Sequence, residues 1–294
     1  MPSDIKTIAI TDNQYPSLLK QINDPPKTLY YRGDISIAHQ QHIIAIVGSR
    51  KINTYGNQAL KKIAEPLPSQ NIIIVSGLAY GVDSLAHKIC VSQKKPTIAV
   101  LGTGIDDASI YPSSNRTLAN NIIATGGLLL SEYPPGTRGQ KYHFPARNRI
   151  IAGLSTLTIV VQARKKSGSL ITSRLATEYN RDVGVVPGPI TDPLSEGTNH
   201  LLTQGAYPIL ESTNITELLG IEQIENQPTL PLQNFTPDQE KILQLLSNEP
   251  IHTSHIIEKS QIPIHQLNVI LTELELIGYI QNTGNMKYIK TSNT

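Results

Sequence analysis

The chain has 294 residues, enough for one large domain and a small one, and its formal net charge is +2 at pH 7. A hydrophobic content of 39% and a charged content of 16% exclude an intrinsically disordered chain and are typical of a protein with a large buried sheet. The single cysteine, Cys90, excludes an internal disulfide framework, and no apolar run reaches the length of a membrane helix, so we expect a cytoplasmic protein with no membrane segment.

Residues 42–220 are predicted to form one α/β domain, and a lead-in at 1–41 is expected to pack on it through a short helix near Leu18 and an extended segment at 29–31. The predicted strands are 43–47, 72–75, 98–101, 128–130, 157–161, 183–186 and 207–210. The predicted helices are 54–65, 82–93, 114–123, 145–153, 168–180 and 197–204. The strand segments are rich in Val and Ile and almost continuously apolar, so both of their faces should be buried. This pattern predicts a doubly wound, mostly parallel sheet.

A small winged-helix domain is predicted at 236–294, after a linker at 221–235 that lacks periodicity and contains two prolines. Thr236 and Pro237 are a typical helix start. Two further helices are expected, at 253–259 and after Pro263, and a hairpin then completes the winged-helix pattern.

The charge of this small domain does not favour binding to duplex DNA. It holds four basic and six acidic residues, a net charge of −2, and the expected recognition helix at 263–276 has no Lys or Arg. A helix that reads the major groove normally uses such side chains for phosphate and base contacts. A protein-interaction role is therefore at least as well supported, and a transcriptional regulator is disfavoured.

Positive charge is concentrated between residues 136 and 182. This stretch holds nine basic and two acidic residues, a local net charge of +7, whereas the rest of the chain sums to −5. The surplus lies beside Gly- and Ser-rich turns, which is typical of a site for several phosphates. The backbone of a nucleic acid is the obvious ligand.

Small and polar residues follow nearly every predicted strand. In a doubly wound sheet these turns share the carboxyl edge, where such folds bind ligands and where helix N-termini favour anions. Gly48-Ser49-Arg50 follows the first strand, either as a tight turn with a solvated Arg or as a phosphate clamp. There is no GxGxxG and no GxxxxGK[ST] sequence, so a dinucleotide site or a Walker loop is disfavoured.

A second basic turn, Arg164-Lys165-Lys166, leads into Ser167-Gly168-Ser169 at a predicted helix start. A solvated charge run is the bland alternative. Because the run lies at the carboxyl end of a strand and precedes a helix N-terminus, we favour anion binding.

Two arginines follow Pro145 at another helix start. Arg147 and Arg149 are two positions apart, so they point to different sides of a regular helix, and one is expected to face phosphate while the other braces a loop. Phe144, one of two phenylalanines, either packs in the core or provides a stacking platform for an unpaired base.

The acidic residues near the same edge are expected to be structural. Asp83 and His87 lie on one face of a helix and could form a general acid–base pair. We favour the alternative, in which Asp83 accepts hydrogen bonds from the turn amides before it and His87 is a structural histidine. Asp106, Asp107 and Glu132 could bind a metal ion or act as bases, but no spacing among them is diagnostic of either role, so we expect them to hold loops. We therefore expect no metal and no cofactor.

Eight stretches in a fixed order together resemble one family. They are IVGSR (46–50), SGLAYGVDSLAH (76–87), AVLGTGIDDASIYP (99–112), SEYPPG (131–136), FPARNRIIAGLS (144–155), VVQARKKSGSLITSRLA (160–176), VVPGPI (185–190) and EGTNHLLTQGA (196–206). In these stretches the chain resembles the DNA-processing protein A family, also called DprA or Smf. The lead-in and the winged helix also resemble that family's arrangement.

The resemblance implies an extended Rossmann-like domain that binds single-stranded DNA, without nuclease or ATPase activity. It implies a protein that protects incoming strands during natural transformation (competence) and loads the RecA recombinase on them in DNA recombination, usually as a homodimer. Together with Arg149, the DNA-binding residues that the motifs carry over are Ser49, Arg50, Phe144, Arg147, Asn148, Lys166, Ser167, Gly168 and Ser169. Family members often have an acid where Gln162 stands, so a role for that carboxylate does not carry over.

The alternative function is that of a nucleotide-binding glycosidase of the lysine-decarboxylase-like family, which has a related fold. That family has the motif PGGxGTxEE at a similar turn. Here the corresponding residues run from Ser167 to Thr172, with no carboxylate where the paired glutamates would lie. This difference argues against hydrolysis, and we expect a binding protein rather than an enzyme.

Overall fold

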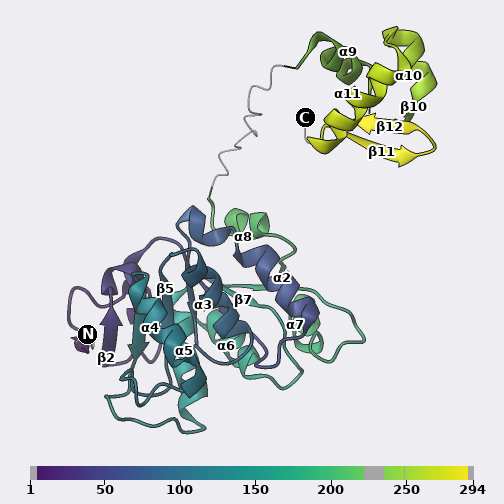
Figure 1. Cartoon of the computed structure of the whole chain (residues 1–294). Helices are drawn as coiled ribbons and strands as arrows, with labels where there is room; N and C mark the ends of the chain where they lie inside the picture. The colour runs from purple at the N-terminus through teal and green to yellow at the C-terminus, as the bar shows by residue number, and fades with distance from the viewer. Residues whose placement is uncertain (1–4, 222–234, 248, 291–294) are drawn as a thin grey trace. The chain divides into compact units, whose positions relative to one another are not determined.

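The computed structural model describes residues 5–221, 235–247 and 249–290 (Figure 1). The chain divides into two compact units, 1–223 and 224–294. Residues 222–234, nearly all of the predicted linker, lie outside the described ranges. Within the described ranges, no helix is both long and apolar enough to cross a membrane.

The first unit is built on one nine-stranded sheet, with strand order β1-β2-β6-β5-β4-β3-β7-β8-β9. The strands are β1 (Lys6–Ala9), β2 (Thr28–Gly33), β3 (Ile43–Val47), β4 (Ile73–Ser76), β5 (Thr97–Val100), β6 (Leu128–Ser131), β7 (Leu157–Val160), β8 (Asp182–Val185) and β9 (Tyr207–Pro208). All neighbours from β6 to β9 pair in parallel. The predicted doubly wound, mostly parallel, Rossmann-like sheet is confirmed.

The lead-in extends this sheet. β2 pairs antiparallel with β6, and β1 pairs antiparallel with β2, so two added strands close one side of the parallel core. The predicted extended segment at 29–31 is the centre of β2, whereas β1 was not predicted. Only one of its four residues, Ile8, is buried, so its sequence carries little of the apolar signal of a core strand.

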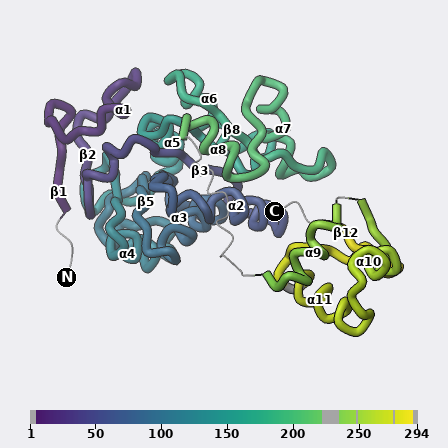
Figure 2. Tube along the Cα trace, turned by 90° about the horizontal axis from the view of Figure 1, so that it is seen from above, coloured from purple at the N-terminus to yellow at the C-terminus, as the bar shows by residue number. Residues whose placement is uncertain are grey.

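Helices cover both faces of the sheet, as Figure 2 shows. One face carries α2 (Thr54–Ala64), α3 (Val82–Ser92) and α4 (Arg116–Ala124), and the other carries α5 (His143–Leu154) and α6 (Gly168–Glu178). The remaining helices of the unit are α1 (Ser17–Lys20), α7 (Glu196–Thr203), α8 (Ser212–Leu218) and the 3-10 helices η1 (Ile35–His39), η2 (Leu67–Gln70) and η3 (Ser113–Asn115).

The central strand shows why its sequence is continuously apolar. In β3, Ile43, Ala45 and Val47 pack in the core beneath α5 and α6, while Ile44 and Ile46 pack in the core beneath α2 and α3. Burying each Val or Ile side chain stabilises the fold by about 1.5–3 kcal/mol. β3 therefore belongs at the middle of the sheet, where both faces exclude water.

The strand order reverses at β3. From β3 the chain first builds outward through β4, β5 and β6, then returns to the other side of β3 with β7, β8 and β9. In doubly wound folds the crevice between such neighbours, outside their carboxyl ends, is the usual ligand site. In this protein that crevice lies between the ends of β3 and β7.

The second unit has the predicted winged-helix pattern. Its helices are α9 (Pro237–Leu245), α10 (Thr253–Ser260) and α11 (Ile264–Leu276), and its strands are β10 (Ile251–His252), β11 (Ile280–Gly284) and β12 (Lys287–Lys290) in the order β10-β12-β11. Thr236 caps α9 by accepting a hydrogen bond from the Gln239 amide, as its sequence indicates. The helices and hairpin enclose a separate core that includes Ile242, Leu267 and Leu271.

Candidate nucleic-acid interface

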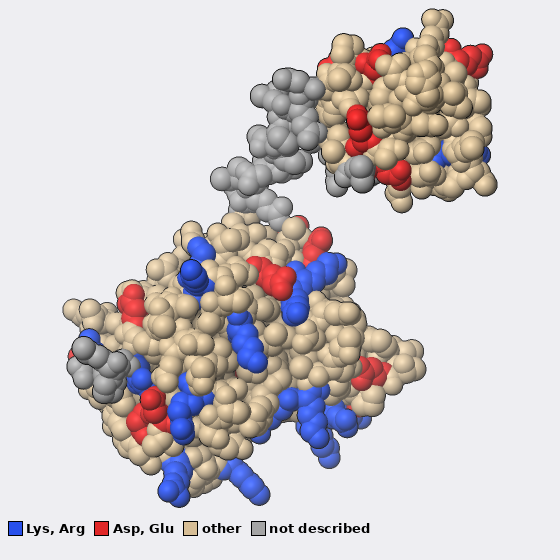
Figure 3. Space-filling view, viewed as in Figure 1, with Lys and Arg blue, Asp and Glu red and all other residues tan. Residues whose placement is uncertain are grey.

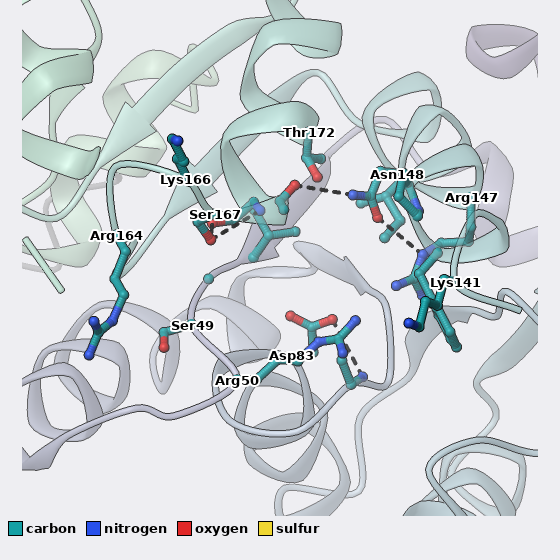
Figure 4. A pocket seen from close by; sticks show the side chains of 18 residues that line it. Ser49, Arg50, Asp83, Lys141, Arg147, Asn148, Arg164, Lys166, Ser167 and Thr172 are labelled. Atoms are coloured by element: carbon teal, nitrogen blue, oxygen red, sulfur yellow. Dashed lines mark hydrogen bonds between the residues drawn. The ribbon is translucent and has the colours of Figure 1, made fainter. Parts of the chain in front are cut away.

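A cavity of about 340 Å³ lies at the crevice between β3 and β7 (Figure 4). Its walls are the turn after β3, the turn after β7, and the first turns of α3, α5 and α6. Segments more than 100 residues apart in the chain, such as Ser49 and Ser167, thus line one site. Nine of the ten predicted DNA-binding residues line it: Ser49, Arg50, Phe144, Arg147, Asn148, Lys166, Ser167, Gly168 and Ser169.

Exposed cations surround this cavity. Arg50, Lys141, Arg164 and Lys166 all line it and are exposed to solvent. Figure 4 shows Arg164 and Lys166 on one side of the cavity and Lys141 on the other, and Figure 3 shows Lys and Arg side chains gathered along one margin of the unit. Cations that converge on a concave site from several sides raise the local concentration of anions there.

The first turn of α6 contributes neutral donors to the same cavity. Ser167 caps the helix, its hydroxyl accepting a hydrogen bond from the Ser169 amide at 3.4 Å. A Cβ atom at Gly168 would meet no atom within 4 Å, so the backbone at this position is open to a ligand. Helix N-termini favour anions because their first amides lack intrahelical partners. The predicted turn with anion-binding character therefore faces the cavity.

Arg147 lies at the bottom of the cavity rather than at its mouth. Its side chain is buried, and its guanidinium donates hydrogen bonds to the carbonyls of Gly77, at 2.6 Å, and of Val100. Burial lowers the pKa of Arg147 to about 10, and the nearby Asp83 carboxylate partly offsets this effect. Arg147 thus ties together the ends of β4 and β5 while remaining positively charged at neutral pH.

Asp83 is the single carboxylate lining the cavity among the described residues. Its carboxylate accepts hydrogen bonds from the amides of Gly77 at 3.1 Å and Ala79 at 3.4 Å, which is the structural role that the sequence predicted. Burial raises the pKa of Asp83, and Arg147 acts in the opposite direction. A lone, hydrogen-bonded carboxylate does not form the pair that glycoside hydrolysis requires, so the alternative function gains no support here.

Arg149 lies outside the cavity. Its guanidinium forms hydrogen bonds with Glu132 at 2.7 and 2.9 Å and with the backbone carbonyl of Asp24 at 3.0 Å. The two arginines of α5 do point to different sides, as expected, and Arg149 is the one that braces a loop. The proposed contact of Arg149 with DNA is therefore not carried forward, because this side chain already binds the lead-in and the end of β6.

The other polar residues of this edge also serve the structure. Asp106 accepts a hydrogen bond from the Gly136 amide at 2.8 Å, and Asp107 forms an ion pair with Arg32 at 2.8 Å. His87 is buried, with its Nδ1 atom 2.9 Å from the Thr97 hydroxyl, and burial lowers its pKa to about 3. The described residues contain no group of three or more His, Cys, Asp or Glu that could hold a metal ion.

Gln162 holds two segments together through its side-chain amide group. Gln162 Nε2 donates a hydrogen bond to Asn53 Oδ1 at 2.8 Å, and Gln162 Oε1 accepts one from the backbone N–H of Asn53 at 3.3 Å. Asn53 in turn caps α2 through the Gly56 amide. An amide matches this pair of contacts, since it both donates and accepts, so Gln162 joins the end of β7 to the start of α2.

Sequence reasoning missed one charged residue of the cavity wall, Lys141. It belongs to the stretch of +7 net charge, but it lies in the loop before α5, where no motif singled it out. Arg164 lines the same wall and belongs to the basic turn for which anion binding was predicted. Asn148, which was predicted, donates to the Gly168 carbonyl at 3.2 Å and so connects α5 to the start of α6.

Comparison with known proteins gives relatives named DprA or Smf. DNA processing protein DprA from Bacillus subtilis is 44% identical over 221 residues, which cover 75% of this chain and 73% of the relative. Protein Smf from Synechocystis is 36% identical over 313 residues, covering 94% and 78%. The structure of DprA from Streptococcus pneumoniae aligns with a TM-score of 0.68 and 40% identity, covering 73% of this chain and 74% of that one.

A second solved structure is that of DNA processing protein A from Helicobacter pylori, described for its single-stranded DNA binding mode. It aligns with a TM-score of 0.65 and 34% identity, covering 74% of this chain and 98% of that one. The family of DNA recombination-mediator protein A matches residues 6–220, and the DprA winged helix domain matches residues 226–284. The family that matches residues 6–220 is one of recombination mediators and not of enzymes. The chain therefore belongs to the DNA recombination-mediator protein A family.

Proposed function

We propose that the cavity between the ends of β3 and β7 binds the sugar-phosphate backbone of single-stranded DNA. Four exposed cations and the first turn of α6 surround one concave site, and this arrangement is the observation that carries the proposal. The relative from Helicobacter pylori, described as binding single-stranded DNA, supports the same ligand. A flexible single strand can bend into such a cavity, whereas a duplex, with a persistence length of about 50 nm, is too stiff to do so.

In this proposal the DNA-contacting residues are Ser49, Arg50, Lys166 and the start of α6, with Lys141 and Arg164 added. Binding is largely electrostatic, so it depends little on base sequence and strongly on salt. Bound protein would shield the strand from nucleases. We further propose that it loads RecA on that strand, acts as a homodimer, and works in the cytoplasm during natural transformation.

The test is a titration of fluorescent oligodeoxythymidines of increasing length with the full chain, alongside a duplex of matched length. We expect tighter binding of the single strand, and an unchanged or greater preference for the duplex would refute the proposal. Nuclease protection of the bound strand and light scattering of the free protein test strand protection and the homodimer separately.

RecA loading needs its own assay. The RecA ATPase on single-stranded DNA reports filament assembly, and its lag should shorten when the protein is present. A lag that does not change would leave the DNA site in place but contradict the mediator role toward RecA.

A further inference from the structure

Phe144, which the sequence offers either as a core residue or as a stacking platform, is partly buried, and its ring is flanked on several sides. The Arg50 guanidinium lies 5.6 Å from its ring centroid, and the Tyr111 ring lies 5.5 Å away at an interplanar angle of 45°. Backbone also crowds its edge, because a Cβ atom at Gly102 or Gly139 would come within about 3 Å of the ring. A nucleobase that stacked on Phe144 would have to displace one of these neighbours.

Two tyrosines next to Phe144 offer the free aromatic surface instead. Tyr111 is 50% exposed and Tyr80 is 48% exposed, and both line a cleft that shares Arg50 and Phe144 with the main cavity. The cleft encloses only about 10 Å³, which is room for about one water molecule. A base cannot enter it, and so would lie across its mouth against the tyrosines.

The segments that carry the two tyrosines are tied together before any ligand binds. Ser114 donates a hydrogen bond to the Tyr80 hydroxyl at 3.3 Å, and Asn115 donates one to the Leu78 carbonyl at 2.9 Å. These contacts join η3 to the turn after β4, while the Tyr111 ring is held by its contact with Phe144. Aromatic groups fixed in advance lose little conformational freedom on binding.

We infer that Tyr111 and Tyr80 form a stacking site for an unpaired base of the same strand whose phosphates occupy the main cavity. The inference rests on the proposed function and adds a base contact to it. The charge around the site supports a nucleotide, because Arg50 borders both the cleft and the cavity and can hold the phosphate next to the stacked base. Stacking of this kind tolerates any base, since every base has a π-face.

The test uses the full chain and oligodeoxynucleotides with a single 2-aminopurine placed at successive positions. The fluorescence of 2-aminopurine falls when it stacks, and the chain has no tryptophan to interfere. In the wild type we expect quenching at one position along the strand. Tyr111→Leu should remove the quenching there and lower affinity roughly five- to 150-fold, the range expected for one base–aromatic stack.

Matched variants separate stacking from other effects. Tyr111→Phe keeps the ring and should bind like the wild type, and Tyr80→Leu tests the site independently if Tyr111→Leu does not fold. Because stacking involves no ion, Tyr111→Leu should leave the salt dependence of binding unchanged. A single abasic nucleotide at the quenched position should weaken binding of the wild type and have no further effect on Tyr111→Leu.

The outcomes distinguish this site from the DNA cavity. If both leucine variants fold and keep wild-type affinity and quenching, the stacking site is refuted while single-strand binding stands. If Phe144→Leu, and neither tyrosine change, removes the quenching, Phe144 is the platform and the inference is wrong. If the wild type binds no single strand, the inference falls together with the proposed function.

Discussion

Removing one cation from the cavity should change the salt dependence of DNA binding by a calculable amount. Four exposed cations line the cavity: Arg50, Lys141, Arg164 and Lys166. If each neutralises one phosphate of a single strand, the slope of log K against log salt is about −2.8, since each contributes about −0.7. Lys166→Gln should reduce the slope to about −2.1.

This difference is large enough to measure. Between 50 and 200 mM salt, a slope of about −2.8 lowers affinity about 50-fold, whereas a slope of about −2.1 lowers it about 20-fold. Fluorescence anisotropy with a labelled oligodeoxythymidine gives both slopes from titrations at four or five salt concentrations. Thermal unfolding checks that the variant is folded, as expected for an exposed side chain.

Lys61→Gln is the matched control. Lys61 is exposed on the last turn of α2, at the opposite end of that helix from the β3 turn that lines the cavity. Its removal should leave the slope at the wild-type value. The assignment of the cavity would be refuted if Lys166→Gln kept the wild-type slope, or if Lys61→Gln reduced it equally.

Two further predictions concern the buried arginine and the bracing one. Arg147→Met should destabilise the fold by about 3–5 kcal/mol in urea unfolding, because Asp83 loses its counter-charge, and a second change, Asp83→Asn, should restore part of that loss. Burial already raises the pKa of Asp83 in the folded state above its unfolded value of about 3.9. The free energy of unfolding therefore falls as pH rises from that unfolded pKa through the folded pKa. In Arg147→Met this fall should extend to higher pH, and a stability profile identical to that of the wild type would contradict the pairing. Arg149→Met should cost about 1–3 kcal/mol by removing the hydrogen bonds to Glu132, with no change in the salt slope, and a shallower slope would return Arg149 to the DNA site.

The sequence predicted the site better than it predicted the role of each side chain within it. Gly- and Ser-rich turns after apolar strands identify the carboxyl edge of the sheet, and local charge predicts an anionic ligand there, because both signals lie in short segments. The crevice between β3 and β7 depends on strand order, which arises from pairing between distant segments. It therefore has no local signature.

The two arginines of α5 show the same limit at the level of single residues. Helical spacing predicts that Arg147 and Arg149 point to different sides, and they do. Which of them faces the cavity is decided by partners far away in the sequence: the carbonyl of Gly77 for Arg147 and Asp24 of the lead-in for Arg149. Pairwise spacing on one helix carries no information about those partners.

The last strand of the sheet limits how two copies of the protein can meet there. β9 is only two residues long, and one of them, Pro208, has no N–H group to offer a neighbouring strand. Short edge strands that contain proline prevent a sheet from pairing with a strand of another molecule. Self-association along this border must therefore use side chains, such as the exposed Leu210, and cannot form one continuous hydrogen-bonded ladder across two subunits.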